Sequence, residues 1–207
     1  MSATLDLVDL ACVRGGRALF SHVNQRLRGG ELLRVNGANG AGKSSLLRMV
    51  CGLLAPAAGQ VLWRGEPPAR QREALGHDLA YLGHTAALKD DLGALENLQS
   101  TTTLGGHPAS RADALRALAD AGLRGHEHMP VRRLSQGQRQ RAALARLGLA
   151  SGAALWVLDE PFNALDVAAT GWLAGLVRAQ LVRGGIVVLT SHQGVPLDDV
   201  PHQVLAL

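Results

Sequence analysis

The chain has 207 residues, 47% of them apolar, and a formal net charge of +4 at pH 7, which suits one α/β domain or a core with a small subdomain. Its basic residues are scattered, which argues against a nucleic-acid surface, and its two cysteines, Cys12 and Cys51, form no CxxC pair, which argues against a metal or redox site. Residues 1–13 carry no basic leader, and the longest uncharged apolar run, 147–158, falls short of the roughly 20 residues of a membrane helix, so we expect neither a signal peptide nor a membrane span.

The first third of the chain is predicted to be mostly β-structure. Leucine alternates with aspartate in the opening residues, as in a half-exposed strand, and a second strand returns after a glycine turn. This pair predicts a small antiparallel β layer. Strands are expected at 4–13, 18–27, 31–36, 61–64 and 79–83, with a helix at 44–51.

The middle third loses the strand pattern and predicts an all-helical insertion. Helices are expected at 92–98, 111–121 and 137–149. Ser110 is a suitable N-cap for the second of these helices, and Gly122 a suitable stop.

Strands alternate with helices again in the last third. They are expected at 154–158, 186–190 and 203–207, with a helix at 167–182. Such alternation predicts a parallel core sheet with right-handed crossovers. The whole chain, 1–207, is then one domain, with a core from about 1–84 and 150–207 and a helical subdomain at about 85–149.

A glycine-rich loop, G-A-N-G-A-G-K-S at 37–44, lies between a predicted strand and a predicted helix and matches the phosphate-binding pattern GxxxxGK[ST]. Its N–H groups and the helix start are expected to bind phosphates, with Lys43 on the β- and γ-phosphates and the Ser44 hydroxyl on Mg²⁺. Only two lysines stand among the 21 basic residues, which suggests that Lys43 is kept as a compact point charge. The alternative is an ordinary glycine turn. The predicted nucleotide-binding residues are Gly37, Ala38, Asn39, Gly40, Ala41, Gly42, Lys43, Ser44 and Ser45.

Two acids, Asp159 and Glu160, follow the apolar strand expected at 154–158. In a phosphate-binding-loop enzyme, Asp159 is expected to help hold Mg²⁺ and Glu160 to polarise the attacking water. The alternative is a helix N-cap with a first-turn acid, which Pro161 would also suit.

Two further segments point to an anion. The sequence Leu-Ser-Gln-Gly-Gln at 134–138 predicts a second anion-binding helix start, although a simple capped helix fits as well. Because one chain has one phosphate-binding loop, this second cradle is expected to serve another copy. His192 follows the strand at 186–190 and is predicted to bond a γ-phosphate oxygen or the water, a structural histidine being the alternative.

These motifs and their order resemble the ATP-binding cassette (ABC) ATPases over essentially the whole chain. They are the loop at 37–44, LSQGQ at 134–138, VLDEP at 157–161, NALD at 163–166 and His192. The resemblance implies a P-loop NTPase fold, with a RecA-like parallel core sheet, an antiparallel β layer and an inserted helical subdomain. It also implies ATP and Mg²⁺ as cofactors and Asp166 as part of the D-loop.

The resemblance further implies a head-to-tail homodimer with two ATP molecules at the seam. Each ATP would lie between Lys43 of one chain and the signature residues of the other, while the helical region contacts a separate membrane protein. The signature residues that act in trans are Ser135, Gln136, Gly137 and Gln138.

Two positions depart from the family pattern. His84 stands where the family usually has the glutamine of the Q-loop. The adenine-stacking aromatic expected near Arg14 is missing; Arg14 itself could stack through its guanidinium plane, with Phe20 the less favoured substitute.

These departures, with other features, resemble the ATP-binding subunits of cytochrome c maturation systems. The features are Gly-His-Asp at 76–78, ALENL at 94–98, Trp63 and the run at 184–193. The resemblance implies an ATPase that drives haem export, or haem release from its chaperone, by dimer closure. It would lie peripherally on the cytoplasmic face of the bacterial inner membrane, with integral membrane subunits and a haem-handling membrane protein as partners and no nucleic acid.

Three other functions compete with this interpretation. A subunit of another exporter, for a lipid or a drug, would show the same chemistry. A soluble ABC protein of translation or DNA repair is disfavoured by the single cassette and the absence of heptads. A binding module without catalysis is disfavoured by the intact Lys43, Asp159, Glu160 and His192.

Overall fold

The computed structural model describes residues 3–106, 108–191 and 194–207. The strands are β1 (Thr4–Arg14), β2 (Arg17–Arg28), β3 (Leu32–Asn36), β4 (Ala58–Trp63), β5 (Leu79–Leu82), β6 (Leu155–Leu158), β7 (Ile186–Thr190) and β8 (His202–Ala206). The α-helices are α1 (Lys43–Val50), α2 (Arg72–Asp78), α3 (Ala94–Leu104), α4 (Arg111–Asp120), α5 (Gln136–Leu144) and α6 (Val167–Val182), and the 3₁₀ turns are η1 (Pro68–Arg70), η2 (Val131–Arg133) and η3 (Ala145–Leu149).

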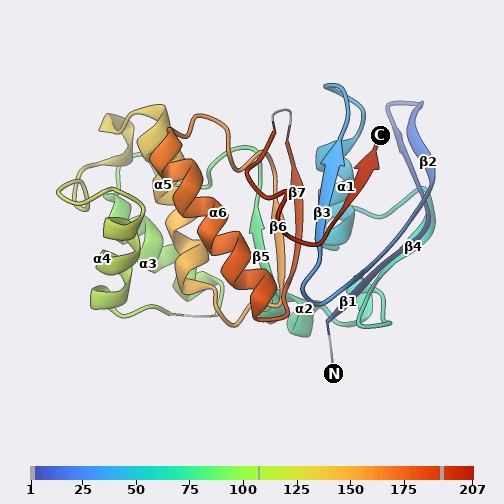
Figure 1. Ribbon diagram of the computed structural model, residues 1–207, viewed down its shortest axis with the longest axis horizontal. Helices are drawn as coiled ribbons and strands as arrows, with labels where there is room; N and C mark the ends of the chain where they lie inside the picture. Colours follow the sequence, from blue (N-terminus) through green and yellow to red (C-terminus); the bar gives the residue numbers. More distant parts are fainter. Residues whose placement is uncertain (1–2, 107, 192–193) are drawn as a thin grey trace.

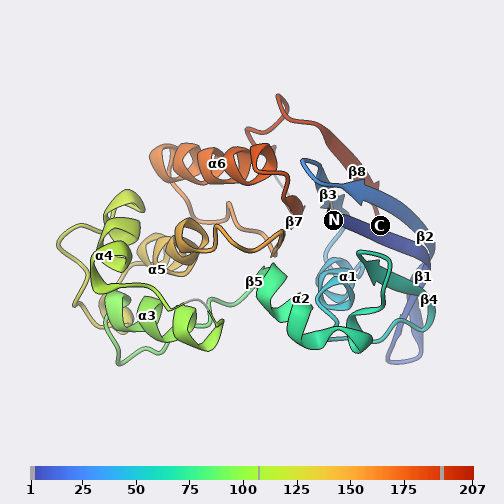
Figure 2. The ribbon, with the colours of Figure 1, turned by 90° about the horizontal axis from the view of Figure 1, so that it is seen from below.

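A parallel sheet in the order β5-β6-β7-β3-β8 forms the centre of the molecule (Figure 1). Its inner strands are buried on both faces because successive side chains point to opposite sides. Leu155 and Val157 of β6 join the cluster on the α1 side, whereas Trp156 and Leu158 join the cluster on the α6 side. The predicted parallel core sheet is confirmed, and Figure 2 shows α6 on one face with α1 and α2 on the other.

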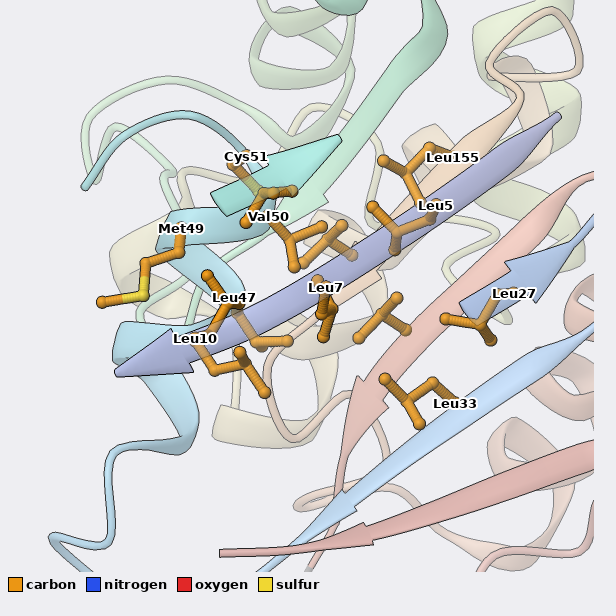
Figure 3. Packing of buried hydrophobic residues seen from close by; sticks show 14 of the residues in the cluster. Leu5, Leu7, Leu10, Leu27, Leu33, Leu47, Met49, Val50, Cys51 and Leu155 are labelled. Carbon is orange, nitrogen blue, oxygen red and sulfur yellow. The ribbon is translucent and has the colours of Figure 1, made fainter. Parts of the chain in front are cut away.

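Helix α1 is enclosed between the parallel sheet and an antiparallel sheet of order β2-β1-β4. In Figure 3, Leu7 and Leu10 of β1 approach Leu47 of α1 within the buried cluster. Cys51 follows α1 in the same cluster, and burial raises the pKa of its thiol. Cys12 is also free and buried, so both thiols belong to the core. This packing fixes the helix start at which the phosphate-binding loop ends.

The antiparallel sheet contains a third strand, β4, in addition to the predicted pair. The short strand predicted at 61–64 begins earlier, at Ala58, and pairs with β1, a partner that the sequence analysis did not assign. Helix α2 was missed altogether, because seven residues including Gly76 carry little helical pattern. Tertiary contact holds it: the Trp63 indole donates to the Asp78 carboxylate at the end of the helix, at 2.9 Å.

Helices α3, α4 and α5 form a lobe beyond the β5 edge of the parallel sheet, with a hydrophobic cluster of its own (Figure 1). Ser110 caps α4 as predicted, accepting a hydrogen bond from the Asp113 N–H. The helix expected at 137–149 is only partly right, because it becomes the 3₁₀ turn η3 at Ala145. Within the described ranges, none of the helices has both the length and the apolar character needed to cross a bilayer.

Helix α3 runs past its predicted end at residue 98 through three threonines. Threonine is a weak helix former because its branched side chain is restricted. Here the Thr101 and Thr103 hydroxyls donate to carbonyls one turn back, each at 2.8 Å, and Thr102 does the same at 3.0 Å. These bonds satisfy the hydroxyls within the helix.

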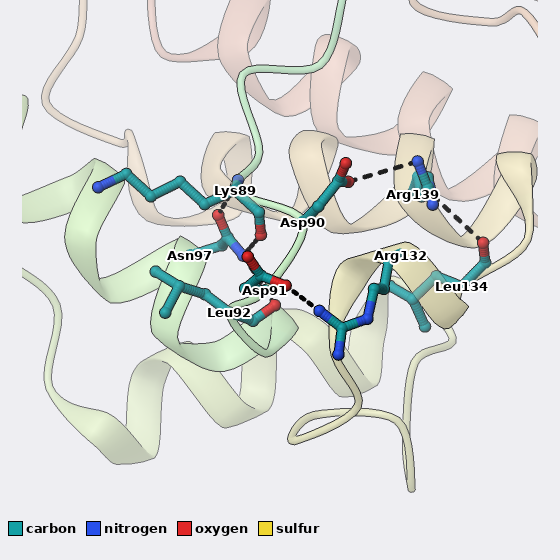
Figure 4. Close-up of polar contacts among 8 residues, drawn as sticks. All are labelled: Lys89, Asp90, Asp91, Leu92, Asn97, Arg132, Leu134 and Arg139. Atoms are coloured by element: carbon teal, nitrogen blue, oxygen red, sulfur yellow. Dashed lines mark hydrogen bonds and ion pairs between the residues drawn. The ribbon is translucent and has the colours of Figure 1, made fainter.

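Asn97 of α3 holds the segment 89–93, which follows the loop of His84. Its side chain is only 3% exposed. The amide oxygen accepts from the Lys89 N–H at 2.7 Å, and the amide nitrogen donates to the carbonyls of Lys89, Leu92 and Gly93 at 3.0–3.2 Å. Figure 4 shows this amide at the centre of the turn.

The same segment is tied to the start of α5. Asp90 forms an ion pair with Arg139 at 3.5 Å, and Asp91 pairs with Arg132 (Figure 4). The Arg132 N–H also donates to the Asp90 carbonyl. These side chains are largely exposed, so each ion pair contributes little alone; together they join the segment 89–93 to the lobe that carries the signature.

We expect Asn97→Leu to lower the free energy of unfolding by about 2–4 kcal/mol, because it leaves buried backbone groups without partners. Denaturant unfolding followed by circular dichroism measures the loss. Ser100→Ala, on the exposed side of the same helix, is the control and should change stability by less than about 0.5 kcal/mol. Equal stability of the two variants would contradict the role of Asn97.

Candidate functional site

The glycine loop brings backbone N–H groups and a lysine to the start of α1. Gly42, the N-cap residue, has φ 107°, and a Cβ there would lie 2.9 Å from the Phe20 ring, so both its conformation and its neighbour require glycine. Lys43 is only 7% exposed. Its ammonium donates to the carbonyls of Gly37 and Ala38 at 2.7 and 3.1 Å. The loop is thus wrapped around a buried positive charge, at a helix start that favours anions.

Asp159 lies beneath this loop and is 4% exposed. Its carboxylate accepts from the Ser44 hydroxyl and from the Thr190 hydroxyl, each at 2.7 Å. Residues 159–164 form bends and turns, so the alternative of a helix N-cap at these acids is wrong. A hydroxyl and a carboxylate held together are oxygen ligands that suit Mg²⁺, which also takes phosphate oxygens and water. Among the described residues there is no group of three or more His, Cys, Asp or Glu side chains that could hold a metal.

Glu160 is half-buried and has an unusual backbone conformation, with φ 51°. Its N–H donates to the Thr190 hydroxyl at 2.8 Å, and its carboxylate accepts from the Asn163 amide. Both its main chain and its side chain are therefore held by neighbours.

These elements surround one open hollow of about 300 Å³. It is lined by Leu19, Asn39, Gly40, Gly42, Lys43, Ser44, Ser45, His84 and Glu160. The phosphate-binding loop, the Q-loop position and Glu160 are thus brought together. Arg14 is exposed at the end of β1 and is not among the lining residues, and Phe20 is buried against Gly42 and not available to stack on a base.

The signature segment is not part of the lining of that hollow. Ser135 caps α5 by accepting from the Gln138 N–H at 3.2 Å, and the Gln138 side chain accepts from the Ser135 N–H at 2.9 Å. Ser135 and Gln136 are exposed, and Gly137 lies close to the Ala164 carbonyl. The start of α5 therefore does not contribute to the hollow that the phosphate-binding loop of the same chain borders.

The predicted D-loop residue Asp166 and the predicted γ-phosphate ligand His192 remain to be placed in the fold. Asp166 is the N-cap of α6 and accepts from the Ala169 N–H at 2.8 Å, a role that its place in the NALD motif did not suggest. His192 lies outside the described residues.

Sequence reasoning missed three residues of the site: Leu19, Asn163 and Thr190. Leu19 lines the hollow from β2, a place that no periodicity marks. Asn163 and Thr190 contact Glu160. A polar residue that ends an otherwise apolar strand was the one available signal, and it pointed to Thr190.

Comparisons with known proteins show the family of the chain. A family model described as ABC transporter matches residues 20–163. The chain is 50% identical over 191 residues to the cytochrome c biogenesis ATP-binding export protein CcmA of Dechloromonas aromatica, covering 92% of this chain and 93% of that protein. It is 48% identical over 204 residues to the protein of the same name from Albidiferax ferrireducens, covering 99% and 97%. A solved ATP-binding subunit of an ABC transporter shares the fold, with a TM-score of 0.83 at 24% identity over 97% of this chain and 85% of that one.

Proposed function

The chain belongs to the ABC transporter family of ATP-binding proteins, and on this premise we propose that it is the ATP-hydrolysing subunit of an export complex in cytochrome c biogenesis. As a member it is an ATPase that works with membrane subunits. One observation carries the assignment of its site: Lys43, Ser44 and Glu160 border one hollow, while Ser135 lies outside it.

The loop at 37–44 binds the phosphates of ATP in this proposal. Its N–H groups and the α1 start face the anion, and Lys43 leaves the carbonyls of Gly37 and Ala38 to meet the β- and γ-phosphates. Ser44 and Asp159 would hold Mg²⁺, which neutralises phosphate charge when bound. The hydrogen bond between the Ser44 hydroxyl and the Asp159 carboxylate, at 2.7 Å, supports this pairing.

Glu160 orients the attacking water and accepts its proton. Its carboxylate borders the hollow beside the phosphate-binding loop, and the contact with Asn163 fixes its direction. His84, on the same lining, occupies the position from which the nucleotide state would be passed to the membrane partner. Assignment of Arg14 to the adenine stays a prediction.

A second copy of the chain completes each site. In a head-to-tail dimer, the exposed start of α5 in one copy faces the ATP held by the other. Its capped N–H groups and dipole favour the γ-phosphate. Ser135 and Gly137 would lie nearest, with Gln136 and Gln138 beside them.

Mixing two inactive variants tests the shared site. Lys43→Ala removes the phosphate ligand, and Ser135→Asp keeps the helix cap but adds a negative charge opposite the phosphate. Each variant alone should be nearly inactive. In a mixture, random pairing gives dimers with one intact site, so we expect roughly a quarter of the wild-type rate, measured as phosphate release.

The control is one chain that carries both substitutions, mixed with each single variant. None of these pairings can assemble an intact site, so none should recover activity. If the mixture of Lys43→Ala with Ser135→Asp stays as inactive as each variant alone, the proposal of a shared site is wrong.

The cytochrome c role is supported by the relatives named for it, which cover nearly the whole chain. Integral membrane subunits and a haem-handling membrane protein are then the partners, and the cytoplasmic face of the inner membrane is the location. Affinity purification from membranes followed by mass spectrometry tests this. Recovery of a lipid or drug transporter subunit instead would favour the alternative exporter.

A further inference from the structure

We propose that Thr190 is a positioning residue of the ATPase site, which acts on turnover through Glu160. Thr190 is the last residue of β7 and is fully buried. Its hydroxyl accepts from the Glu160 N–H at 2.8 Å and donates to the Asp159 carboxylate at 2.7 Å. One hydroxyl therefore contacts the carboxylate of Asp159 and the main chain of Glu160. The inference rests on the proposed ATPase function and deepens it.

Glu160 needs such an anchor because of its backbone. With φ 51° it lies in the left-handed region, which is unfavourable for a non-glycine residue and persists only where neighbours enforce it. The hydrogen bond from its N–H to Thr190 is one such constraint. This conformation accompanies a side chain that borders the hollow. Loss of the bond would let the backbone relax and move the carboxylate.

The strand that carries Thr190 argues that the hydroxyl is there for these bonds. The four residues before it, 186–189, are apolar and completely buried, and valine would fit the same branched shape. A buried hydroxyl is tolerated only when it is hydrogen-bonded. Thr190 also pairs with Val35 of β3, two residues before the phosphate-binding loop. The register of the parallel sheet thus places Thr190 beside the strand that leads into the phosphate-binding loop.

A positioning role and a structural role predict different measurements. If Thr190 only supported the fold, its loss would lower stability and weaken nucleotide binding together. If it acted mainly through Asp159, the Mg²⁺ dependence of binding would shift. Action through Glu160 lowers kcat and leaves the affinity for Mg²⁺-ADP nearly unchanged, since that carboxylate is assigned to the water rather than to the nucleotide.

The test compares Thr190→Val with Thr190→Ser in the full chain. Removing a partner that orients a reactive group lowers activity by about 10–100-fold, so we expect Thr190→Val to lose that much kcat. Its affinity for Mg²⁺-ADP, titrated at several Mg²⁺ concentrations, should stay within about 3-fold, and the serine variant, which keeps the hydroxyl, should recover most of the rate. The control is Thr102→Val, which removes a buried hydroxyl from α3 and should turn over at the wild-type rate.

Any one of three results would overturn the inference. Thr190→Val could turn over at the wild-type rate, Thr190→Ser could fail to recover the rate, or the loss of Mg²⁺-ADP affinity could be as large as the loss of kcat. If Thr190→Val does not fold, Thr190→Cys is measured with the same expectation, because its thiol bonds only weakly. A wild-type chain without ATP hydrolysis would overturn the proposed function as well, whereas normal hydrolysis by both wild type and Thr190→Val would overturn this inference alone.

Discussion

Glu160→Gln is expected to bind ATP and to stop hydrolysing it. Glutamine has nearly the same shape, and its amide oxygen can still accept from Asn163, so the side chain should keep its place. The backbone contact with Thr190 is unaffected. What is lost is the ability to take a proton from water, and removal of a general base lowers the rate by about 10²–10⁴-fold.

Phosphate release measures the loss of hydrolysis, and size-exclusion chromatography with ATP measures the dimer that forms when ATP stays bound. If the chain closes as the proposed head-to-tail dimer, the variant should accumulate as an ATP-bound dimer, because closure needs only ATP whereas reopening needs hydrolysis. Glu73→Gln, an exposed acid on α2, is the matched control and should behave as wild type. Full hydrolysis by Glu160→Gln would remove Glu160 as the base.

Lys43→Ala should weaken nucleotide binding by about 10–100-fold, in line with about 1.5–3 kcal/mol for hydrogen bonds to a charged group. The ammonium is buried among the carbonyls of the loop, at the helix start. Without it, the phosphates lose a point charge, and the carbonyls of Gly37 and Ala38 lose a donor. Isothermal titration with Mg²⁺-ATP measures the affinity, and thermal unfolding without nucleotide separates this effect from misfolding.

The second lysine of the chain offers a matched control. Lys89 is exposed, and Lys89→Ala should bind ATP as wild type does. Lys43→Arg should not restore affinity, because a planar guanidinium cannot replace a compact ammonium in a closed loop. Wild-type affinity in Lys43→Ala would refute the phosphate contact.

Much of the fold could be predicted because its signals are local. The helix at 167–182 has the predicted bounds, and the parallel arrangement of the core strands is confirmed. The phosphate-binding loop was visible because glycine, lysine and serine at fixed spacing describe a backbone shape. Local signals failed where a partner distant in sequence decides the outcome: α2 depends on Trp63, and the place of β4 depends on pairing with β1.

The residues of the candidate site also fall into those that a local motif predicted and those whose role depends on segments distant in sequence. Residues with a motif, such as Ser44 and Asp159, were predicted from the sequence, and the structure puts them in hydrogen-bond contact. The role of Leu19 had no signal in the sequence, and the polar end of β7 marked Thr190 without revealing its partners. Both roles depend on which strands lie side by side. Phe20 was considered for adenine and instead packs beneath Gly42, a contact that no spacing in the sequence reveals.

The enclosure of α1 between two sheets has a thermodynamic consequence. Packing on both sides opposes fraying of the helix, so we expect the amides at its start to be aligned before a phosphate binds. Association then requires little loss of conformational entropy at this loop, and preorganisation of this kind favours affinity. We therefore expect any rearrangement that accompanies nucleotide exchange to arise outside this loop, in the α3–α5 lobe or, in the proposed dimer, between copies of the chain.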